Sequence, residues 1–165
     1  LIAEDEPLLL ESLVEICGEI EDVMVLTAQN GAESLNILKT KEVDAVLSDI
    51  NMPKMTGIEV LREARKLGIE VPYTFLSGYG DKQNITQALS LNATDFLEKP
   101  FRHEELIAVV TRTLDLGRAF RALNKELERL VAEGKIQKDS FEALKKAKIA
   151  MVQMKFNNEF RAKSS

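Results

Sequence analysis

The feature that most constrains this sequence is the regular alternation of short apolar runs with amphipathic stretches over its first hundred residues. Five apolar runs predict strands, at residues 1–3, 23–27, 43–48, 71–76 and 94–97. Helical spacing of apolar residues lies between them and predicts helices at residues 8–20, 31–40, 58–67 and 82–91. Strands that are apolar throughout and separated by helices are typical of a parallel sheet covered on both faces, so we expect an α/β fold.

Charge divides the chain close to the point where this alternation stops. Residues 1–117 hold 21 acidic and 10 basic side chains, a net charge of −11. Residues 118–165 hold 6 acidic and 12 basic side chains, a net charge of +6. All four prolines also lie within the first 100 residues, so long helices are expected after them. We therefore predict an α/β domain at residues 1–117 and a basic helical extension at residues 118–165.

The extension is predicted to be a helical hairpin. A heptad seam, marred by one threonine, begins inside the preceding helix and consists of Leu106, Val109, Thr113, Leu116, Phe120, Leu123, Leu127 and Leu130. Gly117 allows a kink or a break in this helix, and Gly134 suits a C-terminal cap. Asp139 with Glu142 predicts a capping box that opens the last helix. The seam favours either pairing between two chains, as a coiled-coil homodimer, or packing within the hairpin.

The basic charge of the extension has more than one interpretation. The simplest is that its charged residues form the solvated faces of two helices. An acidic partner, nucleic acid or the acidic first domain are the alternatives. Because residues 118–165 contain no Tyr or Trp and no known DNA-reading motif, we do not expect nucleic acid to bind this segment.

Composition excludes several kinds of site. One cysteine, Cys17, rules out an internal disulfide, and with the single histidine, His103, it cannot form a Cys/His zinc site. No apolar run approaches the length of about 18 residues that spans a membrane, and no signal peptide is visible. We therefore expect a cytoplasmic protein with no membrane partner. The chain opens without a methionine, and we expect the native N-terminus to lie upstream of Leu1.

Polar residues that are unusual in an apolar core follow four of the predicted strands. They are Glu4-Asp5-Glu6, Asp49, Ser77 and Lys99. In an open parallel sheet, ligands bind outside the carboxyl ends of the strands. Carboxylates that lie close together repel one another unless a cation neutralises them, and oxygen ligands of this kind suit Mg²⁺. A nearby lysine and hydroxyl are suited to phosphoryl oxygens. The set therefore predicts phosphate chemistry on a carboxylate, with an aspartyl phosphate as the covalent state.

These residues resemble the motifs of two-component response regulator receiver domains. The segment Ser48–Gly57 is similar to the phosphoacceptor loop of that family. Glu4–Pro7, Ser77–Tyr79 and Asp95–Pro100 are similar to its other motifs, in order and at the expected spacing, over roughly residues 1–117. The resemblance implies a flavodoxin-like, doubly wound five-stranded parallel sheet of order 2-1-3-4-5, as in chemotaxis regulators.

The resemblance also implies a role for each matching residue. Asp49 matches the aspartate that takes a phosphoryl group from a phosphohistidine on a sensor histidine kinase or a phosphotransfer protein. It implies that Mg²⁺ is bound by Asp5 directly, by Glu4 through water, by Asp49, and by the backbone carbonyl of Asn51. Ser77 matches the hydroxyl that bonds a phosphoryl oxygen, and Lys99 matches the cation that contacts the phosphoryl group. Phe96 matches the switch aromatic.

Three further features come from the same match. Lys99–Pro100 corresponds to the cis peptide of the family, and Tyr79 has the position either of a gate to the phosphate or of a plain turn residue. Ser77, Phe96 and Glu4 stand where the family more often has Thr, Tyr and Asp.

The function implied is that of a signalling switch, not an enzyme, whose phosphorylated form changes dimerisation or partner docking through the extension. One alternative is a receiver-like scaffold or dimerisation module whose output ignores phosphate. Another is a phosphatase with an aspartyl nucleophile. Such a phosphatase needs a second acid two residues after Asp49, where this sequence has Asn51, so this alternative is the weaker one.

Overall fold

The chain forms two compact units in a computed structural model, Leu1–Leu114 and Asp115–Ser165. The structure describes residues 1–78 and 82–163, with side chains described up to residue 156 except those of residues 82 and 83. The boundary between the units lies inside one long helix, α5 (His103–Ala132). With this boundary the first unit has a net charge of −10 and the second a net charge of +5.

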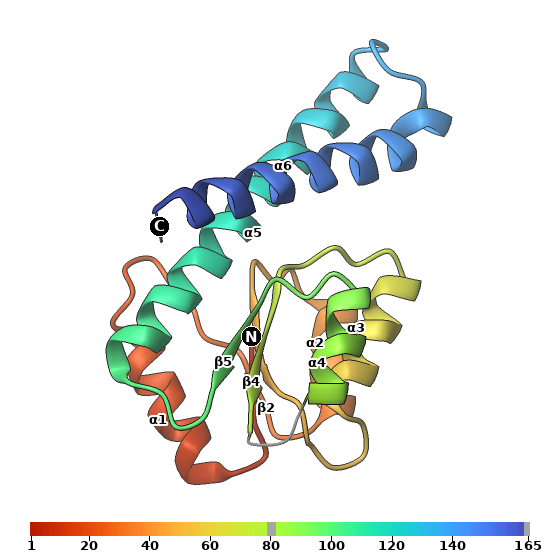
Figure 1. The fold of residues 1–165 in the computed structure, drawn as a ribbon. Coiled ribbons are helices and arrows are strands. Elements are labelled where there is room, and N and C mark those ends of the chain that lie inside the picture. Colours follow the sequence, from red (N-terminus) through yellow and green to blue (C-terminus); the bar gives the residue numbers. More distant parts are fainter. Residues whose placement is uncertain (79–81, 164–165) are drawn as a thin grey trace. The chain divides into compact units, whose positions relative to one another are not determined.

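The first unit is a parallel five-stranded sheet with helices on both faces (Figure 1). Its strands are β1 (Ile2–Ala3), β2 (Thr27–Ala28), β3 (Val46–Asp49), β4 (Tyr73–Ser77) and β5 (Asp95–Glu98). Their order in the sheet is β2-β1-β3-β4-β5, with every pairing parallel. This confirms the α/β class and the doubly wound order that the resemblance implies.

One predicted strand is wrong in position. The apolar run at residues 23–27 predicted a strand, but β2 spans only Thr27–Ala28. Met24 in this run is 85% exposed, so the run is not a continuous piece of the core. The carbonyl oxygen of Leu26, just before β2, accepts a hydrogen bond from the backbone N–H of Ile2 over 2.8 Å.

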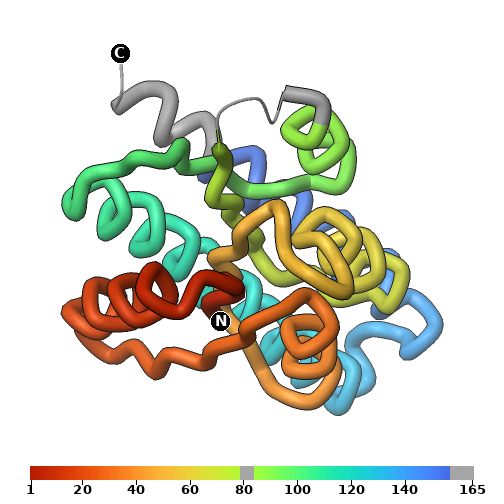
Figure 2. The backbone as a smooth tube through the Cα atoms, turned by 90° about the horizontal axis from the view of Figure 1, so that it is seen from below, coloured from red at the N-terminus to blue at the C-terminus, as the bar shows by residue number. Residues whose placement is uncertain are grey.

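The helices bury two separate cores against the sheet. Helix α1 (Pro7–Gly18) and the first part of α5 cover one face, and α2 (Gly31–Thr40), α3 (Gly57–Lys66) and α4 (Lys82–Ser90) cover the other (Figure 2). Strand residues alternate between these cores, because successive side chains of a strand point to opposite faces. On β4, for example, Phe75 belongs to the α2–α4 side and Leu76 to the α1–α5 side.

Local signals in the sequence explain where several helices begin and end. Pro7 lies in the first turn of α1, where its missing N–H group costs nothing. The side chain of Asn30 caps α2 by accepting a hydrogen bond from the backbone of Glu33 over 3.1 Å. Asn92, which follows α4, has a φ of 58°, the left-handed conformation that asparagine tolerates at a helix C-terminus.

The second unit is a hairpin of the last part of α5 and α6 (Phe141–Lys163), as Figure 1 shows. Leu116, Phe120 and Leu123 of the heptad seam pack with Ile149, Val152 and Phe156 of α6. Earlier in the seam, Leu106 and Val109 belong to the core of the first unit instead. The structure therefore shows packing within the hairpin, one of the two uses predicted for the seam. Within the described range, no helix combines the length and apolar character needed to cross a membrane.

Of the break allowed at Gly117 and the capping box predicted at Asp139, the structure has neither. Helix α5 runs through Gly117 without ending there, because the packing of buried Leu116 and Phe120 outweighs a glycine cost of about 1 kcal/mol. Asp139 does not cap α6, because it lies inside a 3-10 turn, η1 (Lys138–Ser140), that leads directly into the helix. Gly134 has a φ of 70°, as expected for a C-terminal cap.

The threonine that interrupts the heptad seam joins α5 to strand β4 of the sheet. Thr113 Oγ1 donates to the carbonyl oxygen of Val109 over 2.8 Å and lies 2.8 Å from Thr74 Oγ1 on β4. A hydroxyl has one proton to donate, so Thr74 is the donor of the second bond. Thr74 is 1% exposed and Thr113 is 2% exposed, so the pair is shielded from water.

Replacing either threonine by valine tests this assignment. We expect Thr113→Val to lower the free energy of unfolding by about 1–3 kcal/mol, because the buried Thr74 hydroxyl loses its acceptor. Thr74→Val should cost less, about 1 kcal/mol, because the Thr113 hydroxyl still donates to Val109. Urea unfolding of both variants and of the double variant measures the difference. An equal or larger loss for Thr74→Val would show that the donor has been assigned the wrong way round.

Candidate functional site

The ends of three strands bring one half-buried lysine between two buried carboxylates. Lys99 Nζ lies 3.0 Å from Glu4 Oε2 and 2.5 Å from Asp49 Oδ1. Glu4 follows β1, Asp49 is the last residue of β3, and Lys99 follows β5. Glu4 is 2% exposed and Asp49 is 8% exposed, so these carboxylates are largely removed from water. Buried charges need a partner of opposite sign, and Lys99 provides it for both.

The remaining oxygens of the two carboxylates accept hydrogen bonds from the backbone. The N–H of Glu6 donates to Glu4 Oε1 over 3.2 Å, and the N–H of Asn51 donates to Asp49 Oδ2 over 2.6 Å. Burial alone would lower the pKa of Lys99, but its hydrogen bonds to Asp49 and Glu4 outweigh this, and the pKa of Lys99 is raised above its ordinary value. The lysine is therefore fixed as a cation, and all four carboxylate oxygens have donors within the chain.

The predicted gathering of three carboxylates around a metal differs from the arrangement in the structure. Glu4 and Asp49 share the ammonium of Lys99, whereas Asp5 and Asn51 are exposed. Over the described part of the chain, no three His, Cys, Asp or Glu side chains are close enough to hold a metal ion. The donors are still of the right chemical type for Mg²⁺, because they are carboxylate and carbonyl oxygens at one edge of the sheet. A bound Mg²⁺ would therefore have to share this edge with the Lys99 ammonium.

Ser77 and Phe96 lie on the two strands next to the Lys99 site. Ser77 ends β4 and is 3% exposed, and its backbone carbonyl accepts a hydrogen bond from the N–H of Lys99 over 2.8 Å. Phe96 on β5 is partly buried and stacks on Phe75, with ring centroids 5.8 Å apart and an interplanar angle of 23°. The Lys99–Pro100 peptide is cis, as the resemblance implies. Tyr79 lies outside the described residues.

Cys17 and His103 lie away from this edge. Cys17 is buried in the α1–α5 core, as expected for a small core residue. His103 is exposed, and its Nε2 lies 3.0 Å from Glu19 Oε2 at the end of α1.

Gly57 is a site residue whose importance the sequence analysis missed. A Cβ atom at this first residue of α3 would lie 2.3 Å from the carbonyl oxygen of Asp49, 2.8 Å from Ser48 Oγ and 3.0 Å from Phe75 Cε1. A real Cβ cannot approach a backbone oxygen so closely, so only glycine allows α3 to begin directly against the end of β3. The backbone N–H of Gly57 also donates to the carbonyl of Ile50 over 2.9 Å. The start of α3 therefore fixes the backbone that holds Asp49.

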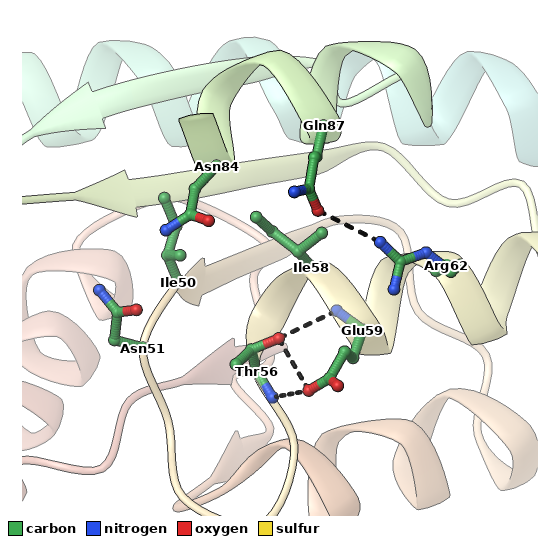
Figure 3. Close-up of a pocket in the computed structure, with 8 residues that line it drawn as sticks. All are labelled: Ile50, Asn51, Thr56, Ile58, Glu59, Arg62, Asn84 and Gln87. Atoms are coloured by element: carbon green, nitrogen blue, oxygen red, sulfur yellow. Dashed lines mark hydrogen bonds between the residues drawn. The ribbon is translucent and has the colours of Figure 1, made fainter. Parts of the chain in front are cut away.

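A polar cleft of about 200 Å³ lies beside the loop that follows Asp49 (Figure 3). It is lined by Ile50, Asn51, Thr56, Ile58, Glu59, Arg62, Asn84 and Gln87. Thr56 and Glu59 form a capping box at the start of α3, a Thr-x-x-Glu signal that was present in the sequence. Arg62 donates to Gln87 over 3.3 Å and links α3 to α4. The cleft therefore marks the place where α3 and α4 meet the Asp49 loop.

Comparison with known proteins identifies the family. The family model described as the response regulator receiver domain matches residues 1–111. The chain belongs to the response regulator receiver family. The two-component receiver resemblance seen in the sequence is thereby confirmed, over the same part of the chain that forms the parallel sheet.

Individual relatives agree with this assignment. The response regulator protein TodT of Pseudomonas putida is 30% identical over 145 residues, which cover 88% of this chain and 60% of TodT. The probable C4-dicarboxylate response regulator DctR of Bacillus subtilis is 36% identical over 107 residues, 64% of this chain and 47% of DctR. The chain thus spans about half to three fifths of the length of these receiver proteins.

A solved structure has the same receiver fold. The receiver domain of the Francisella response regulator 1452 superimposes with a TM-score of 0.63 at 28% identity, covering 69% of this chain and 93% of that domain.

Substitution of Gly57 tests the role of the close approach at the Asp49 strand. We expect Gly57→Ala to lower the free energy of unfolding by about 1–3 kcal/mol, because the added methyl group forces α3 away from Asp49. Gly18→Ala is the matched control, because a Cβ at Gly18 has nothing within 4 Å. That control should be neutral or stabilising by up to about 1 kcal/mol. Chemical unfolding measures the free energy of unfolding of both variants. An equal change in this free energy for Gly57→Ala and Gly18→Ala would contradict the steric constraint at Gly57.

Proposed function

We propose that this chain is a response regulator that accepts a phosphoryl group on Asp49 from a sensor histidine kinase or a phosphotransfer protein. The observation that supports this most is the Glu4–Lys99–Asp49 arrangement, a buried carboxylate held by one cation at the carboxyl edge of a receiver sheet. In the transfer, an oxygen of Asp49 attacks the phosphorus, the bond from phosphorus to the donor histidine nitrogen breaks, and an acyl phosphate forms. Asp49 is a suitable nucleophile because Lys99 and the Asn51 N–H hold its carboxylate in one orientation.

The other site residues have proposed roles in the same step. Lys99 contacts the phosphoryl oxygens, and the hydroxyl of Ser77 bonds one of them, which draws Ser77 and Phe96 into a new packing arrangement. Glu4, Asp5, Asp49 and the backbone carbonyl of Asn51 are the residues that would hold Mg²⁺. When bound, Mg²⁺ supplies positive charge that neutralises the phosphoryl oxygens.

The output is proposed to pass through the helical extension. Residues 1–117 act as the receiver, and residues 118–165 respond by a change in homodimerisation or in partner docking. In this proposal the protein is a cytoplasmic switch rather than an enzyme, and Asn51 in place of a second acid argues against a phosphatase. The extension binds neither a membrane nor nucleic acid.

A phosphate-independent scaffold is the second candidate. It is supported by the observation that every oxygen of Glu4 and Asp49 already has a donor within the chain, so the site is satisfied without phosphate or metal. The two candidates differ in what phosphorylation changes. A scaffold keeps its oligomeric state and its binding partners when Asp49 is modified.

Phosphorylation with a small donor tests the assignment of Asp49. With acetyl phosphate and Mg²⁺, we expect the parent chain to gain the mass of one phosphoryl group and Asp49→Asn to gain none. Asp139→Asn is the matched control, because it removes the same charge from an exposed residue outside the receiver. Intact-mass spectrometry measures the gain. Labelling of Asp49→Asn to the level of the parent would refute the assignment.

Light scattering with and without beryllofluoride measures the oligomeric state and separates a switch, whose oligomeric state changes, from a scaffold, whose oligomeric state does not.

Replacement of Lys99 tests whether Mg²⁺ and the ammonium share one edge. We expect Lys99→Met to lose about 1–3 kcal/mol of stability, because Glu4 and Asp49 then lack their counter-ion. Added Mg²⁺ should recover part of this loss and raise the melting temperature of Lys99→Met more than that of the parent. Lys66→Met removes an exposed ion pair with Glu63 and should cost below about 1 kcal/mol, with no added response to Mg²⁺. An equal Mg²⁺ response in all three proteins would rule out the shared edge.

A further inference from the structure

Helix α6 has two apolar faces, and only one of them is used inside the hairpin. Ile149, Val152 and Phe156 pack against α5. A second group of apolar side chains lies on the opposite side of α6 and is exposed; we call it the outer face, and it consists of Ala143, Ala147, Ala150, Met151 and Met154. At 3.6 residues per turn these five residues fall within an arc of about 100°, centred opposite the side that packs on α5.

The outer face is more apolar than the solvent-facing side of a helix normally is. A helix that packs on one side normally carries charged and polar residues on the other. Here the opposite side has no charged residue within residues 141–156, where side chains are described. Met151 is 59% exposed and Met154 is 64% exposed, so two large apolar side chains face water. The face therefore has the composition of a contact surface, and its five residues are exposed within the described part of the hairpin.

Charges along the borders of the outer face select its partner. Lys146 borders one side of the apolar arc, Lys148 and Lys155 border the other, and all three are exposed. Among the residues of α6 whose side chains are described, the one acidic residue is Glu142, which lies next to Lys146 on the helix surface. Two copies of α6 packed face to face would bring six of these lysines together with two glutamates, so self-association is opposed by repulsion. An acidic partner would instead form ion pairs with the lysines along both borders.

The apolar residues themselves favour a helix as the partner. Ala143, Ala147 and Ala150 follow a spacing of four and three, which lets another helix backbone come close, and Met151 and Met154 adapt to irregular side chains. Helices that lie on membranes usually have Trp, Phe or Leu on the apolar face, and the outer face has none. We propose that the outer face of α6 docks an acidic amphipathic helix of a partner protein. This goes beyond the proposed phosphorylation at Asp49 and does not depend on it.

Binding of a designed peptide to the full chain tests the proposal. The probe is a labelled three-heptad helix with a stripe of leucine and alanine bordered by glutamate, and the matched probe has lysine in place of each glutamate. Fluorescence anisotropy should show that the glutamate peptide binds at least about tenfold more tightly than the lysine peptide. Its affinity should fall as NaCl is raised, because salt screens the exposed border charges.

Variants locate the binding surface. Ala147→Glu places a charge in the centre of the outer face and should weaken binding of the glutamate peptide at least about tenfold. Ala122→Glu is the matched control, because Ala122 is an exposed alanine of the same hairpin on α5, and it should bind the peptide as the parent does. Lys148→Gln with Lys155→Gln should weaken binding and reduce its dependence on salt. Circular dichroism checks that each variant keeps its helices.

Several outcomes would overturn the proposal. If the glutamate and lysine peptides bind equally or not at all, no acidic helix is recognised. If light scattering shows a dimer that Ala147→Glu disrupts and that strengthens as salt is raised, the occupant is a second copy. If vesicles containing phosphatidylserine bind through the outer face and the glutamate peptide does not, the occupant is a membrane surface. Asp49→Asn should bind the peptide as the parent does, so failure of the phosphorylation proposal can be told apart from failure of this one.

Discussion

The shared ammonium of Lys99 is the interaction on which the arrangement of the carboxyl edge depends. Lys99 is 95 positions from Glu4 and 50 positions from Asp49 in the sequence, so only the folded sheet brings the three together. Two carboxylates this deeply buried would strongly oppose folding without a cation between them. The order β2-β1-β3-β4-β5 places the ends of β1 and β3 side by side, and the long lysine side chain reaches them from the end of β5, across β4.

The sequence predicts this edge but not its charge balance. Apolar runs alternating with helical patterns indicate a parallel sheet, and a parallel sheet brings all its strand ends to one side, so the polar residues after the strands are expected to meet. That pattern predicts a metal ion beside Glu4 and Asp49, and this stays a prediction. The contact of the Lys99 ammonium with both carboxylates is not evident from the pattern, because the reach and direction of one long side chain depend on tertiary geometry that spacing does not encode. The same is true of Gly57, which matters only because the carbonyl of Asp49 lies where its Cβ would be.

Periodicity likewise identifies a buried face without identifying what covers it. The heptad seam of α5 is uniform in sequence, yet Leu106 packs in the sheet core, Thr113 bonds to Thr74, and Phe120 packs against α6. Thr113 interrupts the apolar pattern of a coiled coil, but its hydroxyl suits a position that faces another buried hydroxyl. In helix α6, apolar residues lie on two sides, and this weakens the helical periodicity of the sequence. The outer face is therefore not evident from an amphipathic pattern.

Helix α5 belongs to both units, and its two halves pack against different elements. Its first half is fixed to β4 by the buried Thr74–Thr113 bond, one strand residue away from Phe75 and three from Ser77. Its second half packs against α6 through apolar residues such as Leu116 and Phe120. Because the boundary between the two units lies inside α5, this helix is the covalent connection between the receiver sheet and the hairpin.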